Sequence, residues 1–271
     1  MNRRRRRLAG LAVGLVLVAS VAAAQRGRFA VSSRFVPPGA FNGAFLFCRI
    51  SFRNQPAGDG AGWSVDYPRA DLNLSFRLSE LTKVLISRDD AGEINHVVIR
   101  LTDPELSHCP FIMITEPGGA YFDEAEATAL RDYLLKGGFL WADDSWGTRA
   151  EDTWAGEIAK ALPSSIYPIN DVPLNHELFH VLYDVREIPQ IPSIGFWLGT
   201  GGRTSERGSE SATPHVRAIV DERGRIMVLM THNTDFGYAF ERETDNHEYF
   251  LTFAPVGYAF GVNALVYAMS H

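Results

Sequence analysis

Residues 123–147 read DEAEATALRDYLLKGGFLWADDSWG, and this stretch decides the fold. Asp123 is a typical helix N-cap residue, and the two glutamates that follow it suit the positive end of a helix dipole. Apolar residues then recur at helical spacing as far as Gly137-Gly138, a pair typical of a helix C-terminus. An apolar run from Phe139 to Ala142 comes next. The stretch therefore predicts a helix that leads directly into a buried strand.

The same alternation continues on both sides of this stretch. Strands are predicted at residues 45–52, 84–87, 97–101 and 111–115, helices at 71–81, 150–161 and 255–269, and a hairpin at 216–220 and 226–231. Strands that alternate with helices favour right-handed βαβ units. We therefore expect one α/β domain with a mostly parallel sheet.

The N-terminus has the composition of a cleavable signal peptide, which we assign to residues 1–24. Arg3 to Arg7 form a basic segment, an apolar run follows, and Ala22-Ala23-Ala24 offers a cleavage site. The alternative is an uncleaved membrane anchor, but the apolar run is shorter than the ~20 residues that cross a bilayer. The arginines do not lie in a clear twin-arginine pattern. Residues 25–44 predict a tether, and residues 45–271 the domain.

The charge balance limits the partners of the exported chain. The sequence has 26 basic and 32 acidic residues, and loss of the five arginines leaves a formal net charge of −11. Such a surface repels nucleic acid and anionic lipid. We expect no later membrane span, so only an uncleaved signal would hold the chain at a membrane. The possible partners are therefore a small molecule, a carbohydrate or a peptide. We expect the protein to lie outside the cytoplasm, in the periplasm or the medium. The sequence does not indicate a cofactor.

Two cysteines, Cys48 and Cys109, leave two alternatives open. In an oxidising compartment they could form a disulfide that closes a long loop. They could equally be two buried thiols that pack as small apolar side chains. The sequence does not show whether their Cβ atoms are close enough to decide.

Several short segments together resemble a bacterial family named only as domain of unknown function 4159. These segments are Tyr67–Leu74, Leu101–Leu106, Gly137–Leu140 with Asp143-Asp144, and Thr231–Asp235. The resemblance covers about residues 45–271. It implies a relationship to the class I glutamine amidotransferase-like fold, a flavodoxin-like three-layer sandwich, and it implies no activity.

Class I amidotransferases carry a cysteine nucleophile on the sharp turn between a strand and a helix. Here the matching strand is Phe139–Ala142, and Asp143-Asp144 follow it in place of cysteine. Cys109 precedes a strand and Cys48 lies inside one, whereas nucleophiles gather at the carboxyl ends of parallel strands. A carboxylate is a much weaker nucleophile toward an amide than a thiolate. The sequence therefore argues against glutamine amidotransfer.

The acidic pair is the leading candidate for a ligand cleft. Asp143 and Asp144 could simply cap the next helix, but two charges exceed what capping requires, and their repulsion raises the pKa of one of them unless a cation lies nearby. Trp146 and Arg149 follow directly. They could line the same cleft, one as an apolar wall and the other as an anion clamp.

His232 and Asp235 follow another predicted strand and are expected at the same sheet edge. Carboxylates with one imidazole would suit a divalent cation, and His232 could alternatively act as a general base. Each residue alone is also compatible with an ordinary turn. His215 and Arg217 lie nearby in the sequence, and nothing decides whether they face the cleft.

Residues 176–180 read HELFH, which matches the H-E-x-x-H pattern of zinc peptidases. On a helix this spacing places His176 and His180 one turn apart, with Glu177 as the general base. No third ligand follows on a second helix, and Pro189 and Pro192 interrupt the segment. The pattern is a weak metal candidate. Gly199–Gly202 lacks the ending of a phosphate-binding loop and predicts only a polar loop.

Three hypotheses follow, and whether the protein is an enzyme stays open. The preferred one is an exported ligand-binding domain that lacks the nucleophilic cysteine. The second is a metal-assisted hydrolase that uses Asp143, Asp144, His232 and Asp235. The third is a zinc peptidase built on residues 176–180.

Overall fold

The computed structural model describes residue 36 and residues 39–271. The predicted signal peptide and most of the predicted tether lie outside the described residues. The strands are β1 (Phe47–Ile50), β2 (Arg53–Asn54), β3 (His96–Ile99), β4 (Ile112–Thr115), β5 (Ala120–Tyr121), β6 (Leu140–Ser145), β7 (Asn170–Asp171), β8 (His215–Val220) and β9 (Ile226–His232). The α-helices are α2 (Arg69–Leu81), α3 (Glu124–Leu135), α4 (Gly147–Ala161), α5 (Ile194–Thr200), α6 (Phe236–Glu241) and α7 (His247–Ser270).

The central sheet has seven described strands in the order β3-β1-β4-β6-β9-β8-β7. The first five are parallel, whereas β8 and β7 are each antiparallel to their neighbour. The prediction of a mixed α/β domain with a mostly parallel sheet is therefore confirmed. The parallel order places β6 at the centre, so its carboxyl end lies among those of β4 and β9.

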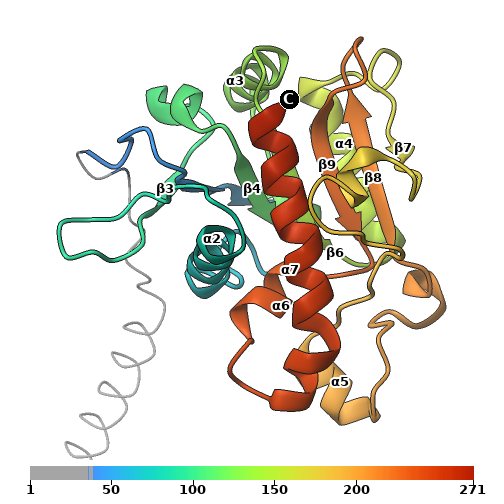
Figure 1. Cartoon of the computed structure of the whole chain (residues 1–271). Helices are drawn as coiled ribbons and strands as arrows, with labels where there is room; N and C mark the ends of the chain where they lie inside the picture. Colours follow the sequence, from blue (N-terminus) through green and yellow to red (C-terminus); the bar gives the residue numbers. More distant parts are fainter. Residues whose placement is uncertain (1–35, 37–38) are drawn as a thin grey trace, which may run out of the picture. The chain divides into compact units, whose positions relative to one another are not determined.

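Helices cover both faces of the sheet and create two apolar cores. Helices α2, α6 and α7 pack on one face together with Trp141 and Leu229, and α3 and α4 pack on the other with Ala142 and Met230. Figure 1 shows α7 in front of the sheet and α4 behind it. Successive residues of one strand enter opposite cores because side chains alternate across a strand. We call these faces the α7 face and the α4 face.

The stretch that decides the fold forms as its residues predict. Asp123 caps α3, and its carboxylate accepts a hydrogen bond from the Glu126 amide while the Glu126 side chain bonds back to the Asp123 amide. This reciprocal pair satisfies two of the amides that a helix start leaves unpaired. The hairpin of β8 and β9 also forms as predicted. The predicted strand at residues 84–87 contributes only one bridge, between Ile86 and Phe45.

The structure corrects the placement of the acidic pair. Strand β6 continues to Ser145, so Asp143 and Asp144 are the fourth and fifth of its six residues and do not begin a helix. Helix α4 begins at Gly147, and its N-cap residue Trp146 makes no side-chain cap hydrogen bond. The capping interpretation of these two aspartates is therefore wrong. Asp143 accepts hydrogen bonds from Thr231 of β9 and Gly237 of α6, and Asp144 accepts one from the Trp146 indole.

Helix α7 is longer than predicted, with Pro255 inside it. In the described part of the chain it is the one helix that is long and apolar enough to cross a membrane, judged by length and composition alone. The sequence-based expectation that no later segment meets these criteria is therefore wrong. Most of its apolar window is buried, and Phe260 and Leu265 belong to the core of the α7 face. The apolar composition follows from this central position between other helices and the sheet.

Cys48 and Cys109 form a disulfide, which settles the alternative left open by the sequence. The bridge joins β1 to the segment before β4, away from the carboxyl ends of both strands. The described end of the predicted tether also packs on the domain: Ala40 is buried, and its carbonyl accepts a hydrogen bond from the Ser87 hydroxyl.

Candidate functional site

A bulge at the end of β6 turns two consecutive carboxylates toward one edge of the sheet. The register between β6 and β9 shifts between Ala142 and Ser145, and Asp144 has a left-handed backbone with φ of 64°. In a regular strand, Asp143 and Asp144 would point to opposite faces. Bulges of this kind redirect side chains and recur near functional sites.

Asp143 is held by the elements around it. Its carboxylate accepts hydrogen bonds from the Thr231 hydroxyl and from the Gly237 amide, the latter at 2.8 Å. Burial raises the pKa of Asp143 to about 6, although these donors act in the opposite direction. Because its oxygens already have partners, Asp143 contributes negative charge and position rather than a free ligand atom.

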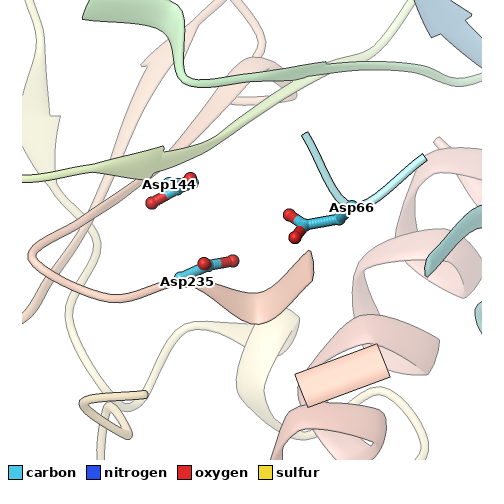
Figure 2. Close-up of side chains that lie close together, drawn as sticks. All are labelled: Asp66, Asp144 and Asp235. Atoms are coloured by element: carbon cyan, nitrogen blue, oxygen red, sulfur yellow. The ribbon is translucent and has the colours of Figure 1, made fainter. Parts of the chain in front are cut away.

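Three other aspartates converge beside Asp143: Asp66, Asp144 and Asp235. One carboxylate oxygen from each lies within 4.8 Å of the others, and all three residues are buried. Figure 2 shows their side chains pointing toward one another, from the loop before α2, from β6 and from the start of α6. We call these three residues the aspartate cluster. The sequence placed Asp144 and Asp235 in one site, and the structure adds Asp66.

Asp66 is held in place through the backbone of its own loop. The side chain of Arg49 is fully buried and donates from Nε to both oxygens of Asp71, each at 3.0 Å. The same guanidinium donates to the carbonyls of Trp63 and Val65 at 3.4 Å. These bonds fix the loop that presents Asp66, whose backbone is left-handed with φ of 61°.

The Asp66 carboxylate has no hydrogen-bond partner within the described structure. Both of its oxygens are buried, and the residue is 5% exposed. It does not cap α2, whose N-cap residue is Pro68. A buried carboxylate without a donor is costly, and it persists only when another group compensates for it.

Burial and mutual repulsion raise the pKa values throughout the aspartate cluster. Burial is the largest cause at each position, and it raises the pKa of Asp66 to about 8. The pKa values of Asp144 and Asp235 are raised well above the usual range, first by burial and then by the neighbouring carboxylates. Glu116 adds to the repulsion on Asp144 and Asp66. Perturbed carboxyl groups gathered at strand ends are typical of functional sites.

His232 does not join the aspartate cluster. It lies at the same edge of the sheet, opposite Ser145 in the ladder, but its side chain is on the α4 face. Its Nε2 is 3.2 Å from Glu151 of α4, and its Nδ1 is 3.3 Å from the Ser145 hydroxyl. The expectation of a shared site is thus corrected by strand alternation, since the preceding Thr231 contacts Asp143 on the α7 face.

Of the other residues considered for the cleft, only Trp146 lies at the aspartate cluster, whereas Arg149 and Arg217 contact other groups. Trp146 lies at the aspartate cluster, where its indole Nε1 donates to Asp144 at 2.9 Å. Arg149 is exposed and donates to the Ala57 carbonyl at 2.7 Å. The structure places no contact between Arg149 and the aspartate cluster. Arg217 contacts Glu151 and Asp171, on the His232 side.

The H-E-x-x-H segment does not have the geometry of a zinc helix. Residues Glu177–Phe179 form a single 3₁₀ turn, so the two imidazoles are not one α-helical turn apart. Nδ1 of His176 accepts from the Leu178 amide at 3.1 Å, and both ring nitrogens of His180 are within 2.8 Å of Asp184 or the Leu174 carbonyl. The helix that this hypothesis requires is absent over residues 176–180.

Comparison with protein families gives a match over most of the chain. The family described as Domain of unknown function (DUF4159) matches residues 49–269, which include all members of the aspartate cluster. No curated protein matches the chain.

Proposed function

The chain belongs to the DUF4159 family, and we propose that it is an exported ligand-binding domain of amidotransferase-like architecture that has no amidotransferase activity. The observation that carries this proposal is the left-handed Asp144 at the strand-to-helix turn. In the amidotransferase-like fold this turn presents the nucleophilic cysteine. Here it presents a carboxylate to a buried acidic site.

The absence of a thiol at this turn supports the proposal. In the described part of the chain no cysteine is free, because Cys48 and Cys109 are joined to each other. A carboxylate cannot replace a thiolate efficiently in attack on a glutamine amide. The site is therefore suited to holding a ligand rather than to forming a thioester.

The chemistry of the site favours a neutral or cationic ligand. The carboxylates of the aspartate cluster are acceptors when ionised, so they suit hydroxyl groups and amines. Trp146 supplies an aromatic surface next to Asp144. A carbohydrate or a basic peptide has these groups, whereas a free anion would be repelled.

A ligand panel tests this proposal. Thermal unfolding of the purified protein is followed with neutral mono- and disaccharides and with lysine-containing dipeptides, once with EDTA and once with added Ca²⁺. We expect at least one compound to raise the Tm of the parent and to have no effect on Asp144→Asn. Ammonia release from glutamine serves as the activity control. Glutamine turnover that disappears in Asp144→Asn, or a panel without any shift, would contradict the proposal.

We also propose that the protein is exported and that the signal peptide is removed. The basic and apolar N-terminal segments support this, and a disulfide is typical of an oxidising compartment. Mass spectrometry of the protein from the cell envelope is expected to find Gln25 as the first residue. A chain that retains Met1–Ala24 in the membrane fraction would instead support the anchor.

A further inference from the structure

We propose that Asp66, Asp144 and Asp235 together bind one hard divalent cation, Ca²⁺, Mg²⁺ or Mn²⁺, at the carboxyl edge of the sheet. The inference deepens the proposed function, because the cation would occupy the same site as the proposed ligand. It depends on that function only because the two share this site. It replaces the metal set expected from the sequence, because His232 faces away and Asp66 takes part.

The spacing of the aspartate cluster suits one ion. Its three oxygens lie within 4.8 Å of one another. Oxygens on opposite sides of one Ca²⁺ are about 4.6–5.2 Å apart, and those on opposite sides of one Mg²⁺ are about 4.1 Å apart. The upper limit of 4.8 Å lies within the range for oxygens that share one Ca²⁺, whereas oxygens that share one Mg²⁺ must be no more than about 4.1 Å apart.

Each member of the cluster has a ligand atom to give. Both oxygens of Asp66 are without partners. Asp144 uses Oδ1 to accept from Trp146, and Asp235 uses Oδ1 to cap α6 by accepting from the Tyr238 amide. Oδ2 of Asp144 and Oδ2 of Asp235 remain. The indole and the helix cap thus orient two carboxylates whose other oxygens can coordinate, in the way that outer hydrogen bonds fix metal ligands.

The charge of the site is not balanced by the protein itself. Within residues 39–271, no lysine or arginine donates a hydrogen bond to the aspartate cluster in the structure. Burial raises the pKa of Asp66 and the charge of the buried Arg49 opposes that rise, but the Arg49 guanidinium donates hydrogen bonds to both oxygens of Asp71 and not to the aspartate cluster. Asp143 and Glu116 add further negative charge. A bound divalent cation would remove this imbalance and give Asp66 the partner that it lacks.

The ligand atoms determine the kind of cation. All three are carboxylate oxygens, which suit Ca²⁺, Mg²⁺ and Mn²⁺, whereas sites for Zn²⁺ and Cu²⁺ usually include nitrogen or sulfur. The structure brings no histidine or cysteine into the described cluster. Water or a ligand oxygen would complete the coordination.

Calorimetric titration of the EDTA-treated protein tests the proposal directly. Ca²⁺, Mg²⁺ and Mn²⁺ are added separately, with no organic ligand present, and we expect one equivalent of at least one of them to bind. Asp66→Asn and Asp144→Asn should each weaken that affinity at least about tenfold. Asp152→Asn is the matched control, because it removes one exposed carboxylate from α4 without touching the site, and its affinity should equal that of the parent.

Terbium luminescence locates the ion. Tb³⁺ substitutes for Ca²⁺, and excited indole transfers energy to it over short distances, so Trp146 beside Asp144 should sensitise the emission. Trp146→Phe should lose most of this emission, and because it also removes the hydrogen bond that orients Asp144, it should weaken the calorimetric affinity for the native cation by about tenfold. Trp63→Phe, on the loop before Asp66, provides a comparison of the same chemical change.

Two results would overturn the proposal. One is the absence of stoichiometric binding by all three ions to folded parent protein. The other is an affinity that stays unchanged in both Asp66→Asn and Asp144→Asn while circular dichroism shows that both variants are folded. After either result, the ligand panel in the presence of EDTA still tests the proposed function independently of the cation. Cation binding with an inactive panel would contradict the proposed function alone.

Discussion

Gly237 lies against Asp66 so closely that a Cβ atom at Gly237 would be 2.6 Å from Oδ2 of Asp66. Gly237 is the second residue of α6, and its amide also donates to Asp143. The glycine therefore allows the start of α6 to approach the aspartate cluster. Gly237→Ala should lower the free energy of unfolding by about 1–3 kcal/mol, because either Asp66 or α6 must move. Urea unfolding measures this change.

Gly156→Ala is the control for this substitution. Gly156 is exposed inside α4, and a Cβ atom there would meet no atom within 4 Å. The same chemical change should therefore raise stability by about 0.5–1 kcal/mol, as expected for glycine replaced by alanine within a helix. Equal effects at both positions would refute the role assigned to the contact between Gly237 and Asp66.

Two buried aspartates should respond oppositely to the same substitution. At pH 9 with EDTA, Asp66→Asn should stabilise the protein by about 1–2 kcal/mol, because it removes an ionised carboxylate that lacks a partner. Asp71→Asn should destabilise it by about 3–5 kcal/mol, because the fully buried Arg49 loses its counter-charge. Denaturant unfolding of both variants checks the signs. Destabilisation by Asp66→Asn would show that this carboxylate is already compensated.

Reduction of the disulfide should lower stability by about 4 kcal/mol on the chain-entropy argument. The estimate follows from the 61-residue separation between Cys48 and Cys109. It is measured by urea unfolding with and without dithiothreitol. A variant with both cysteines replaced by alanine should be less stable and should not respond to the reductant. A parent protein that is also indifferent to dithiothreitol would contradict the prediction.

His232 should make the protein less stable in acid. Burial is the main cause that lowers its pKa, from 6.5 to about 4, with the charges of Arg217 and His215 adding to the effect. Glu151, 3.2 Å away, opposes them. Between these pH values the unfolded chain binds more protons at this residue than the folded chain, so the stabilising contribution falls as the pH falls.

A comparison with His232→Gln isolates this contribution from the acidic site. Between pH 7 and pH 4, the parent should lose on the order of 2 kcal/mol more than the variant, after allowance for solvent screening. Thermal unfolding at a series of pH values provides the measurement. Parallel stability curves for the two proteins would show that His232 is protonated equally easily in both states.

The local signals of the sequence were sufficient for most of the fold. The cap at Asp123, the glycines after α3 and the turn between β8 and β9 act over a few residues, so they can be recognised without knowledge of tertiary contacts. The end of β6 could not be predicted in this way. Its acidic residues remain in the strand because Thr231 and Gly237, about ninety positions later, donate hydrogen bonds to Asp143.

The candidate site was predicted only in part, for two different reasons. Asp66 gives no periodic signal, and it reaches the site because Arg49 binds the carbonyls of its loop. It directly precedes the Tyr67–Leu74 segment, but that position alone does not predict a site. The face of His232, in contrast, was predictable. Residue alternation along β9 already requires Thr231 and His232 to point to opposite sides.

The short strand β7 has a consequence for how the protein behaves at high concentration. An open edge of a sheet can recruit the backbone of another molecule and start aggregation. Here the edge beyond β8 is covered by two exposed polar residues, Asn170 and Asp171, and Asp171 is ion-paired with Arg217. A second molecule could pair its backbone with only the two residues of β7 at this edge, and one of them is charged. The short strand β7 therefore protects the folded chain against self-association at this edge of the sheet.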